Sequence, residues 1–102
     1  MYKLRLDKVA EGQRDQILEY IVQEFDNPVA AKRLELEFKK GFAKIKQQPY
    51  ICPVFQTENS IEVEYRKLIV KNCAAFYHVE ETQKLITVAR IFHMKQNYEK
   101  DL

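Results

Sequence analysis

The chain has 102 residues, of which 46% are hydrophobic, including six Phe and six Tyr; this supports one modest core, and we predict a single domain spanning residues 1–102. Its 17 Lys and Arg nearly balance 15 Asp and Glu, so the net charge of +2 does not by itself indicate a polyanionic partner. No apolar run approaches the ~20 residues needed to cross a bilayer, and we expect no membrane insertion.

The two cysteines, Cys52 and Cys73, both lie in apolar stretches. No charged, apolar leader with a small-residue cleavage site opens the chain, so we expect buried thiols in a cytoplasmic protein and not a disulfide. The cysteines also lack the spacing to the histidines, His78 and His93, that a zinc site needs. We therefore predict no metal site.

The first quarter of the chain predicts a strand followed by a helix. Apolar Tyr2, Leu4 and Leu6 alternate with basic residues, which is the pattern of a half-buried strand. From about residue 7 to residue 25 the apolar residues recur at helical spacing and define one apolar face.

A second helix is predicted to begin within "DNPVAAKR". Asp26 or Asn27 can cap the exposed N–H groups, and Pro28 suits the first turn. The two helices must pack antiparallel because one or two residues join them. Gly41 weakens the second helix by about 1 kcal/mol relative to Ala, and we interpret it as a close approach between the helices. The apolar stripe, expected to face a sheet, consists of Ala31, Leu34, Phe38, Phe42 and Ile45.

Three extended runs complete the chain after the segment "QQPYICPVF", whose prolines indicate an irregular or edge segment. The runs cover residues 61–70, 73–79 and 84–93, and "EETQK" is a plausible hairpin loop. We predict an α+β fold: an N-terminal strand and an antiparallel two-helix hairpin, packed on one face of a twisted antiparallel sheet of about four strands. The other face of the sheet remains available.

No phosphate-binding glycine loop, nucleophile elbow, HExxH or CxxC motif occurs, so the candidate site residues are polar residues of the sheet. Arg90 stands among apolar residues, either as a structural arginine paired with a carboxylate or as an anion contact. His93 closes the last run, either as a surface histidine or as a proton-transfer group. Without a bulge, strand alternation places Val88, Arg90 and Phe92 on one face and His93 on the other.

The order of elements, "NPVAAKRL" and above all "YRKLIVKNCAAFYHVEETQKLITVARIFHMKQNYE" resemble the RelE/ParE superfamily, the toxins of type II toxin–antitoxin systems. The resemblance covers roughly residues 1–100. It is strongest from Tyr65 to Tyr98, where Arg-x-Leu, Phe-Tyr-x-Val, an acidic turn and Arg-Ile-x-His follow in the family's order. It implies a small cytoplasmic toxin without a cofactor, neutralised by a small, acidic, partly disordered antitoxin.

The superfamily divides by target, and the resemblance leaves the target open. RelE-like members bind the ribosome and cleave mRNA without a metal, whereas ParE-like members inhibit DNA gyrase and have no established catalytic site. We predict ribosome-dependent mRNA cleavage, with gyrase inhibition and a degenerate, non-toxic binding module as alternatives. The resemblance and the residue chemistry together assign catalysis to His93, Tyr98 and Arg90, and contacts with RNA phosphates to Lys67, Lys71, Arg66 and Lys95.

Two positions depart from the ribonuclease pattern. Ala74 and Met94 stand where ribonuclease members often place arginines. Metal-free phosphoryl transfer must stabilise the developing charge with protein cations, and the loss of one donor typically costs about 3 kcal/mol. These departures favour a ParE-like or catalytically weakened member.

Overall fold

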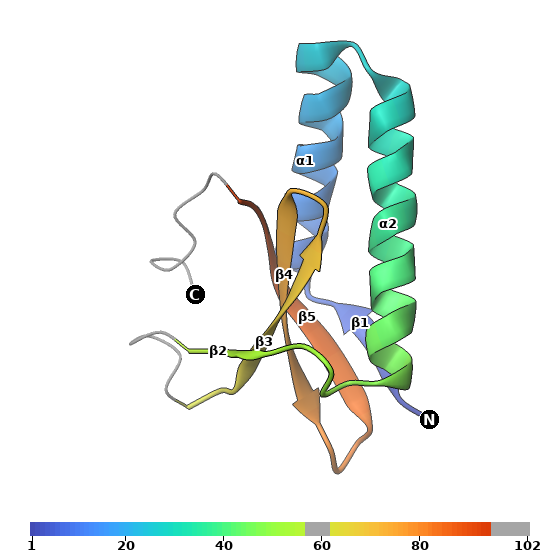
Figure 1. Cartoon of the computed structure of the whole chain (residues 1–102). Helices are drawn as coiled ribbons and strands as arrows, with labels where there is room; N and C mark the ends of the chain where they lie inside the picture. The colour runs from blue at the N-terminus through green and yellow to red at the C-terminus, as the bar shows by residue number, and fades with distance from the viewer. Residues whose placement is uncertain (57–61, 95–102) are drawn as a thin grey trace.

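A computed structural model describes residues 1–56 and 62–94 of the chain, in which two helices pack on one face of a sheet (Figure 1). The predicted order of strand, two helices and three strands is confirmed, with one additional short strand after the helices. The elements are β1 (Lys3–Leu6), α1 (Lys8–Phe25), α2 (Pro28–Gln47), β2 (Val54–Phe55), β3 (Tyr65–Val70), β4 (Cys73–Glu80) and β5 (Leu85–His93).

The sheet has five strands in the order β1-β5-β4-β3-β2. Neighbouring strands are antiparallel except β1, which runs parallel to β5, so the sheet is mixed and not purely antiparallel. The predicted number of about four strands was low because β2 has two residues and follows Pro53, too short for a periodic pattern. The orientation of β1 depends on its neighbour in space, which periodicity does not reveal.

The junction between the helices follows the predicted capping chemistry. The Asn27 side chain accepts a hydrogen bond from the backbone N–H of Ala30 at 3.0 Å, and Pro28 opens α2. Asp26, the alternative candidate for this cap, instead caps the C-terminus of α1, in the left-handed conformation with φ of 45°. This tight connection makes the helices antiparallel neighbours (Figure 1).

The main core lies between the helices and the sheet. The predicted stripe of α2 supplies it with Phe38 and Ile45, which meet residues of β4 and β5 such as Tyr77 and Val88. Cys73 is also buried there, and burial raises the pKa of its thiol to about 11. A smaller cluster of Ala74, Phe76 and Phe92, with Phe55 and Tyr65 against it, forms on the opposite side of the sheet.

Gly41 marks a close approach between α2 and the sheet, so its interpretation as a contact between helices was wrong. A Cβ atom at this position would lie 3.1 Å from Cδ2 of Leu68 and 3.3 Å from Cγ2 of Val70, both on β3. The apolar stripe of α2 faces the sheet, and a side chain at its centre would push the helix away from β3.

The turn between β4 and β5 is held by one carboxylate, that of Glu81. It accepts hydrogen bonds from the hydroxyls of Tyr2, at 2.7 Å, and Tyr50, and it pairs with the ammonium of Lys84. We call these four residues the Glu81 clamp. The hydrogen bonds from Lys84, Tyr50 and Tyr2 lower the pKa of Glu81 to about 2, and the bond to Glu81 raises the pKa of Tyr50 to about 12. The clamp joins three segments that are distant in sequence.

The close approach at Gly41 predicts opposite effects of one substitution at two helical glycines. Gly41→Leu should lower the free energy of unfolding by about 1–3 kcal/mol, because the added side chain overpacks against Leu68 and Val70. A Cβ atom at Gly12 meets nothing within 4 Å, so Gly12→Leu should raise it by about 0.5–1 kcal/mol through helix propensity. Urea unfolding followed by circular dichroism measures both free energies. Similar changes at the two sites would contradict the close packing of α2 on β3 at Gly41.

The Glu81 clamp predicts a stability difference that depends on pH. The folded-state pKa of Glu81 lies below its ordinary value of 4.5, so the ionised carboxylate stabilises the fold above that pH and stops doing so as pH falls towards 2. Wild-type protein should therefore melt at a higher temperature than Glu81→Gln at pH 7, and the difference should shrink between pH 4.5 and 2. Thermal melts across this range test it; a difference independent of pH would refute the clamp.

Candidate functional site

An extra residue in β5 decides where the candidate site residues point. Tyr77 of β4 pairs with Val88, but the preceding Phe76 pairs with Arg90, which leaves Ala89 as a bulge. Val88 therefore belongs to the helix-side core, whereas Arg90 faces the opposite side together with Phe92. The prediction that Arg90 and Phe92 share the face of Val88 is therefore wrong, whereas the prediction that His93 lies on the opposite face from Arg90 is confirmed.

The side of the sheet turned away from the helices, which we call the open face, carries two of the predicted residues. Lys67 and Arg90 pair with Phe76 from the two neighbouring strands, so the three residues lie side by side on this face, with Phe76 buried. The ammonium of Lys67 lies 5.4 Å from the ring centroid of Phe55. The guanidinium of Arg90 lies 3.8 Å from a carboxylate oxygen of Asp7, so this arginine has an ion-pair partner at the surface.

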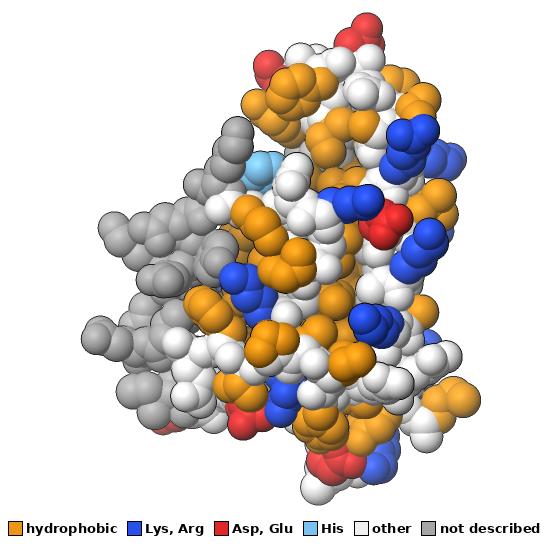
Figure 2. Space-filling view, viewed as in Figure 1, with side chains coloured by type: hydrophobic (Ala, Val, Ile, Leu, Met, Phe, Trp, Pro, Cys, Tyr) orange, Lys and Arg blue, Asp and Glu red, His pale blue; other side chains and the backbone are white. Residues whose placement is uncertain are grey.

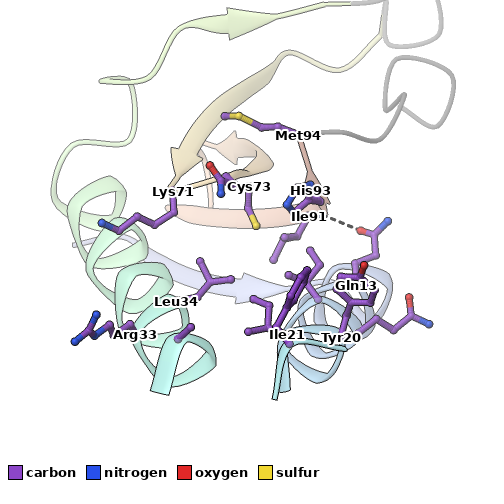
Figure 3. A pocket seen from close by; sticks show the side chains of 15 residues that line it. Gln13, Tyr20, Ile21, Arg33, Leu34, Lys71, Cys73, Ile91, His93 and Met94 are labelled. Atoms are coloured by element: carbon purple, nitrogen blue, oxygen red, sulfur yellow. Dashed lines mark hydrogen bonds between the residues drawn. The ribbon is translucent and has the colours of Figure 1, made fainter. Parts of the chain in front are cut away.

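His93 and Lys71 lie on a different surface, a groove of about 1000 Å³ between the two helices and the adjoining end of the sheet (Figure 3). Ile17 and Ile21 of α1 and Leu34 of α2 supply apolar walls. The side-chain oxygen of Gln13 accepts a hydrogen bond from the backbone N–H of Ile91 at 2.8 Å. The full lining is Gln13, Gln16, Ile17, Tyr20, Ile21, Phe25, Ala30, Arg33, Leu34, Lys71, Asn72, Cys73, Ile91, His93 and Met94.

Arg66 is engaged by the protein's own backbone. Its guanidinium donates to the carbonyl oxygens of Cys52 at 2.7 Å and Tyr50 at 3.2 Å, and it pairs with Glu64 at 3.1 Å. It also stacks over the ring of Tyr50, 5.0 Å from the centroid, and only 16% of its side chain is exposed. These contacts fix the segment before β2, so a phosphate at Arg66 would have to compete with them.

The two positions that lack the expected arginines differ in environment. Ala74 is fully buried in the small cluster of the open face, while Met94 is exposed at the mouth of the groove. Both side chains are uncharged, so neither position supplies a cation. Tyr98 and Lys95, also predicted site residues, lie outside the residues that the structure describes.

His78 is an open-face residue for which the sequence analysis predicted no role in the site. It pairs with Thr87, and its ring lies 5.9 Å from the ring of Tyr65. Burial lowers its pKa, with Arg5 adding to this effect while Glu80 and Asp7 oppose it. Only the register of the strands, which brings β1, β4 and β5 together here, shows that His78 shares a surface with Arg90.

The described residues thus divide the predicted site between two surfaces. Lys67 and Arg90 lie on the open face, and Lys71 and His93 line the groove on the other side of the sheet. A proton-transfer group and the cations that stabilise a phosphoryl transition state must surround the same atoms. His93 lies on the opposite side of the sheet from Arg90 and Lys67, so these three side chains do not surround one phosphate.

No group of three His, Cys, Asp or Glu side chains in residues 1–56 and 62–94 is placed to hold a metal ion. None of the helices in the described part of the chain is long and apolar enough to span a membrane.

Two solved structures have the same fold. A chain of the chromosomal ParDE toxin–antitoxin system from P. aeruginosa superposes with a TM-score of 0.67 and 20% identity, over 91% of this chain and 96% of that one. A chain of the archaeal RelE–RelB complex from Pyrococcus horikoshii OT3 gives a TM-score of 0.54 and 16% identity, over 93% and 97%. The protein therefore has the fold of the RelE/ParE class.

The sequence identifies the family within this class. Residues 4–98 match the family described as the ParE toxin of the type II toxin–antitoxin system parDE. The chain belongs to this ParE toxin family. No match was found among curated protein sequences.

The contacts of Arg66 predict that its loss affects stability. Arg66→Ala should lower the free energy of unfolding by about 2 kcal/mol, because the carbonyl oxygen of Cys52, in a partly buried hydrogen bond, and that of Tyr50 both lose a charged donor. Arg33→Ala is the control: this arginine is exposed, and the change should stay within about 0.5 kcal/mol. Urea unfolding measures both. Equal stability of the two variants would show that the Arg66 contacts contribute little.

Proposed function

We propose that this ParE-family toxin inhibits growth by binding a protein target, DNA gyrase, in the cytoplasm, without catalysing a reaction itself. The observation that supports this is the division of the predicted catalytic residues between the open face and the groove. A binding mechanism does not require His93 and Arg90 to meet at one phosphate, whereas RNA cleavage does.

The local environments of the cations support the same proposal. Arg66 already donates to two backbone carbonyls, and Arg90 lies near the Asp7 carboxylate. Ala74 and Met94 add no positive charge at the positions where a ribonuclease of the superfamily often has arginines. Fewer cations are thus free to stabilise the extra negative charge of a cleavage transition state.

Ribosome-dependent mRNA cleavage is the second candidate, and one observation favours it. Lys67 and Arg90 flank Phe76 on the open face, with the ring of Phe55 5.0 Å from that of Phe76. Cations beside aromatic rings suit RNA, because phosphates pair with the cations and unpaired bases stack on rings. Tyr98, Lys95 and His93 would then have to complete the site.

A cognate antitoxin is the proposed partner, encoded beside the toxin gene. We expect it to be small, acidic and partly disordered. The supporting observation is the charge of α2, whose exposed side is strongly basic and attracts an acidic chain. Its six cations are Lys32, Arg33, Lys39, Lys40, Lys44 and Lys46, against the two carboxylates of Glu35 and Glu37.

The effect of induced expression on cells separates the candidates. Under the proposed function, thymidine incorporation should fall early and cells should filament, while methionine incorporation continues at first. Purified toxin should also inhibit supercoiling by gyrase. Immediate loss of methionine incorporation, with mRNA cut within codons, would replace the proposal by the ribonuclease function. Absence of any effect from soluble protein would indicate a non-toxic binding module.

Two variants test the role of the predicted catalytic residues. His93→Ala and Arg90→Ala should each retain growth inhibition within about twofold of wild type if the toxin acts by binding, because neither residue then carries a chemical step. Inhibition is measured as viable counts after induction, at matched levels of soluble, folded protein. Loss of inhibition by more than about a hundredfold in both variants would support cleavage, since removing a proton-transfer group typically costs that much.

A further inference from the structure

We infer that the outward side of the helical hairpin, the side turned away from the sheet, binds a second copy of this chain in a two-fold symmetric dimer. In this dimer, α1 of each copy lies on α2 of the other. The inference goes beyond the proposed function and does not depend on it. Three observations support it: the opposite charges of the two helices, an exposed apolar line on α2, and the matching levels of the charged residues along the hairpin.

The two helices of the hairpin differ in the sign of their charge. α2 holds six cations against two carboxylates, whereas α1 holds two cations, Lys8 and Arg14, against four carboxylates. Figure 2, in the view of Figure 1, shows Lys and Arg side chains spread along α2. A surface with a basic and an acidic half is complementary to a second copy of itself when the halves are exchanged.

The charges reach the outward side of both helices. With about 3.6 residues per turn, Asp15 and Glu19 lie on the side of α1 away from Ala10, which is completely buried. In the same way, Lys32 and Lys40 lie on the side of α2 away from its buried stripe. All four charged side chains belong to exposed residues. They are therefore accessible to another molecule.

The contacts that two of these side chains make within the chain are local. Asp15 pairs with the adjacent Arg14 at 3.2 Å, and Lys40 pairs with Glu37 of the same helix at 3.7 Å. The side chains of Asp15 and Lys40 nevertheless remain 61% and 75% exposed. Exposed pairs of this kind contribute little to stability, so contacts with a second copy can replace them at small cost.

The outward side of α2 also carries an apolar line. Val29, Leu36 and Ala43 recur every seven residues, and Val29 and Leu36 are 60% and 50% exposed. Residues seven apart lie on nearly the same face of a helix, and apolar residues at this spacing are typical of helices that pack on one another. On α1, Val22 adds a further apolar side chain that is 39% exposed. The line offers apolar contacts between the charges.

Two-fold symmetry brings the complementary residues to matching levels. With the axis running along the hairpin, between the copies, each residue keeps its height above the sheet end of the hairpin. Glu19 lies six residues before the end of α1 and Lys32 four residues after the start of α2. For Asp15 and Lys40 the separations are ten and 12 residues. Each pair is thus offset by about 3 Å along the axis, which a lysine side chain spans. Leu36 lies between the two pairs.

The charges also select this arrangement over others. An axis across the hairpin would place α2 on α2 and α1 on α1, so that like charges face each other. An acidic ligand would match α2 but would be repelled by α1. A second copy, placed with its helices exchanged, matches both helices at once.

The size of the outward side predicts a reversible dimer. α2 has 20 residues and is about 30 Å long, and two helices side by side are about 20 Å wide. Each copy therefore offers about 600 Å², which places the dimer near the lower limit of specific interfaces. Monomer and dimer should exchange as the concentration changes.

Sedimentation of the purified toxin over a range of concentrations tests the inference. Wild type should show a reversible monomer–dimer equilibrium that weakens at high salt. Lys32→Glu and Glu19→Lys should each raise the dimer Kd by about tenfold, because each reversal occurs twice in the symmetric dimer. Lys3→Glu is the matched control, with the same change of charge on exposed β1, and its Kd should change by less than about threefold.

A mixture of the two reversed variants makes the test specific. In a mixed dimer of Lys32→Glu with Glu19→Lys, opposite charges face each other at both contacts, so its Kd should return to within about threefold of wild type. Lys3→Glu has the same net charge as Lys32→Glu, and its mixture with Glu19→Lys should not be restored to the same extent. Circular dichroism confirms that each exposed variant is folded.

A wild-type toxin that stays monomeric at every concentration would overturn the inference. So would a dimer whose Kd neither reversal changes, or a mixture that restores nothing. If the toxin is monomeric and Lys32→Glu weakens binding of the protein encoded by the adjacent reading frame, the outward side belongs to the antitoxin and not to a second copy. None of these measurements involves gyrase or growth, so failure of the inference and failure of the proposed function are separate results.

Discussion

The pairing of β4 with β5 is the constraint on which the rest of this protein depends. These central strands bury Tyr77, Ile86 and Val88 against the helices, and the hydroxyl of Tyr77 donates to the carbonyl of Pro49 at 2.7 Å. Burial is the main reason that the pKa of Tyr77 is raised. The bulge at Ala89 shifts the pairing by one residue, so it determines both which side chains form the core and which face each candidate site residue occupies.

The two surfaces created by this pairing suit different kinds of partner. The open face combines Lys67 and Arg90 with aromatic rings, an arrangement that suits single-stranded RNA. The groove combines apolar walls with the side chains of Arg33 and Lys71, an arrangement that suits a ligand with both apolar and acidic groups. A chain with net charge of only +2 achieves this by concentrating positive charge on α2 and around the groove. Charge placement is more informative here than total charge.

Much of the fold could be predicted from local patterns. Helical spacing from residue 7 to residue 25, and the capping chemistry at Asn27 and Pro28, depend on residues close in sequence. The small β2 and the contact made by Gly41 could not be predicted, because neither leaves a periodic signal. The same reason applies to the Glu81 clamp, which joins segments that meet only in the folded chain.

By itself, the sequence determined the order and type of the main elements, the apolar stripe of α2 and membership of the toxin class, because periodicity, caps and family motifs are all local along the chain. Tertiary structure alone decided that β1 runs parallel to β5, that Arg90 and Val88 occupy opposite faces of the sheet, and that Arg66 supports a loop. It also placed Arg33 and Lys71, which are far apart in sequence, at the same groove. Strand register and bulges depend on contacts between residues far apart in sequence, and no local pattern contains that information.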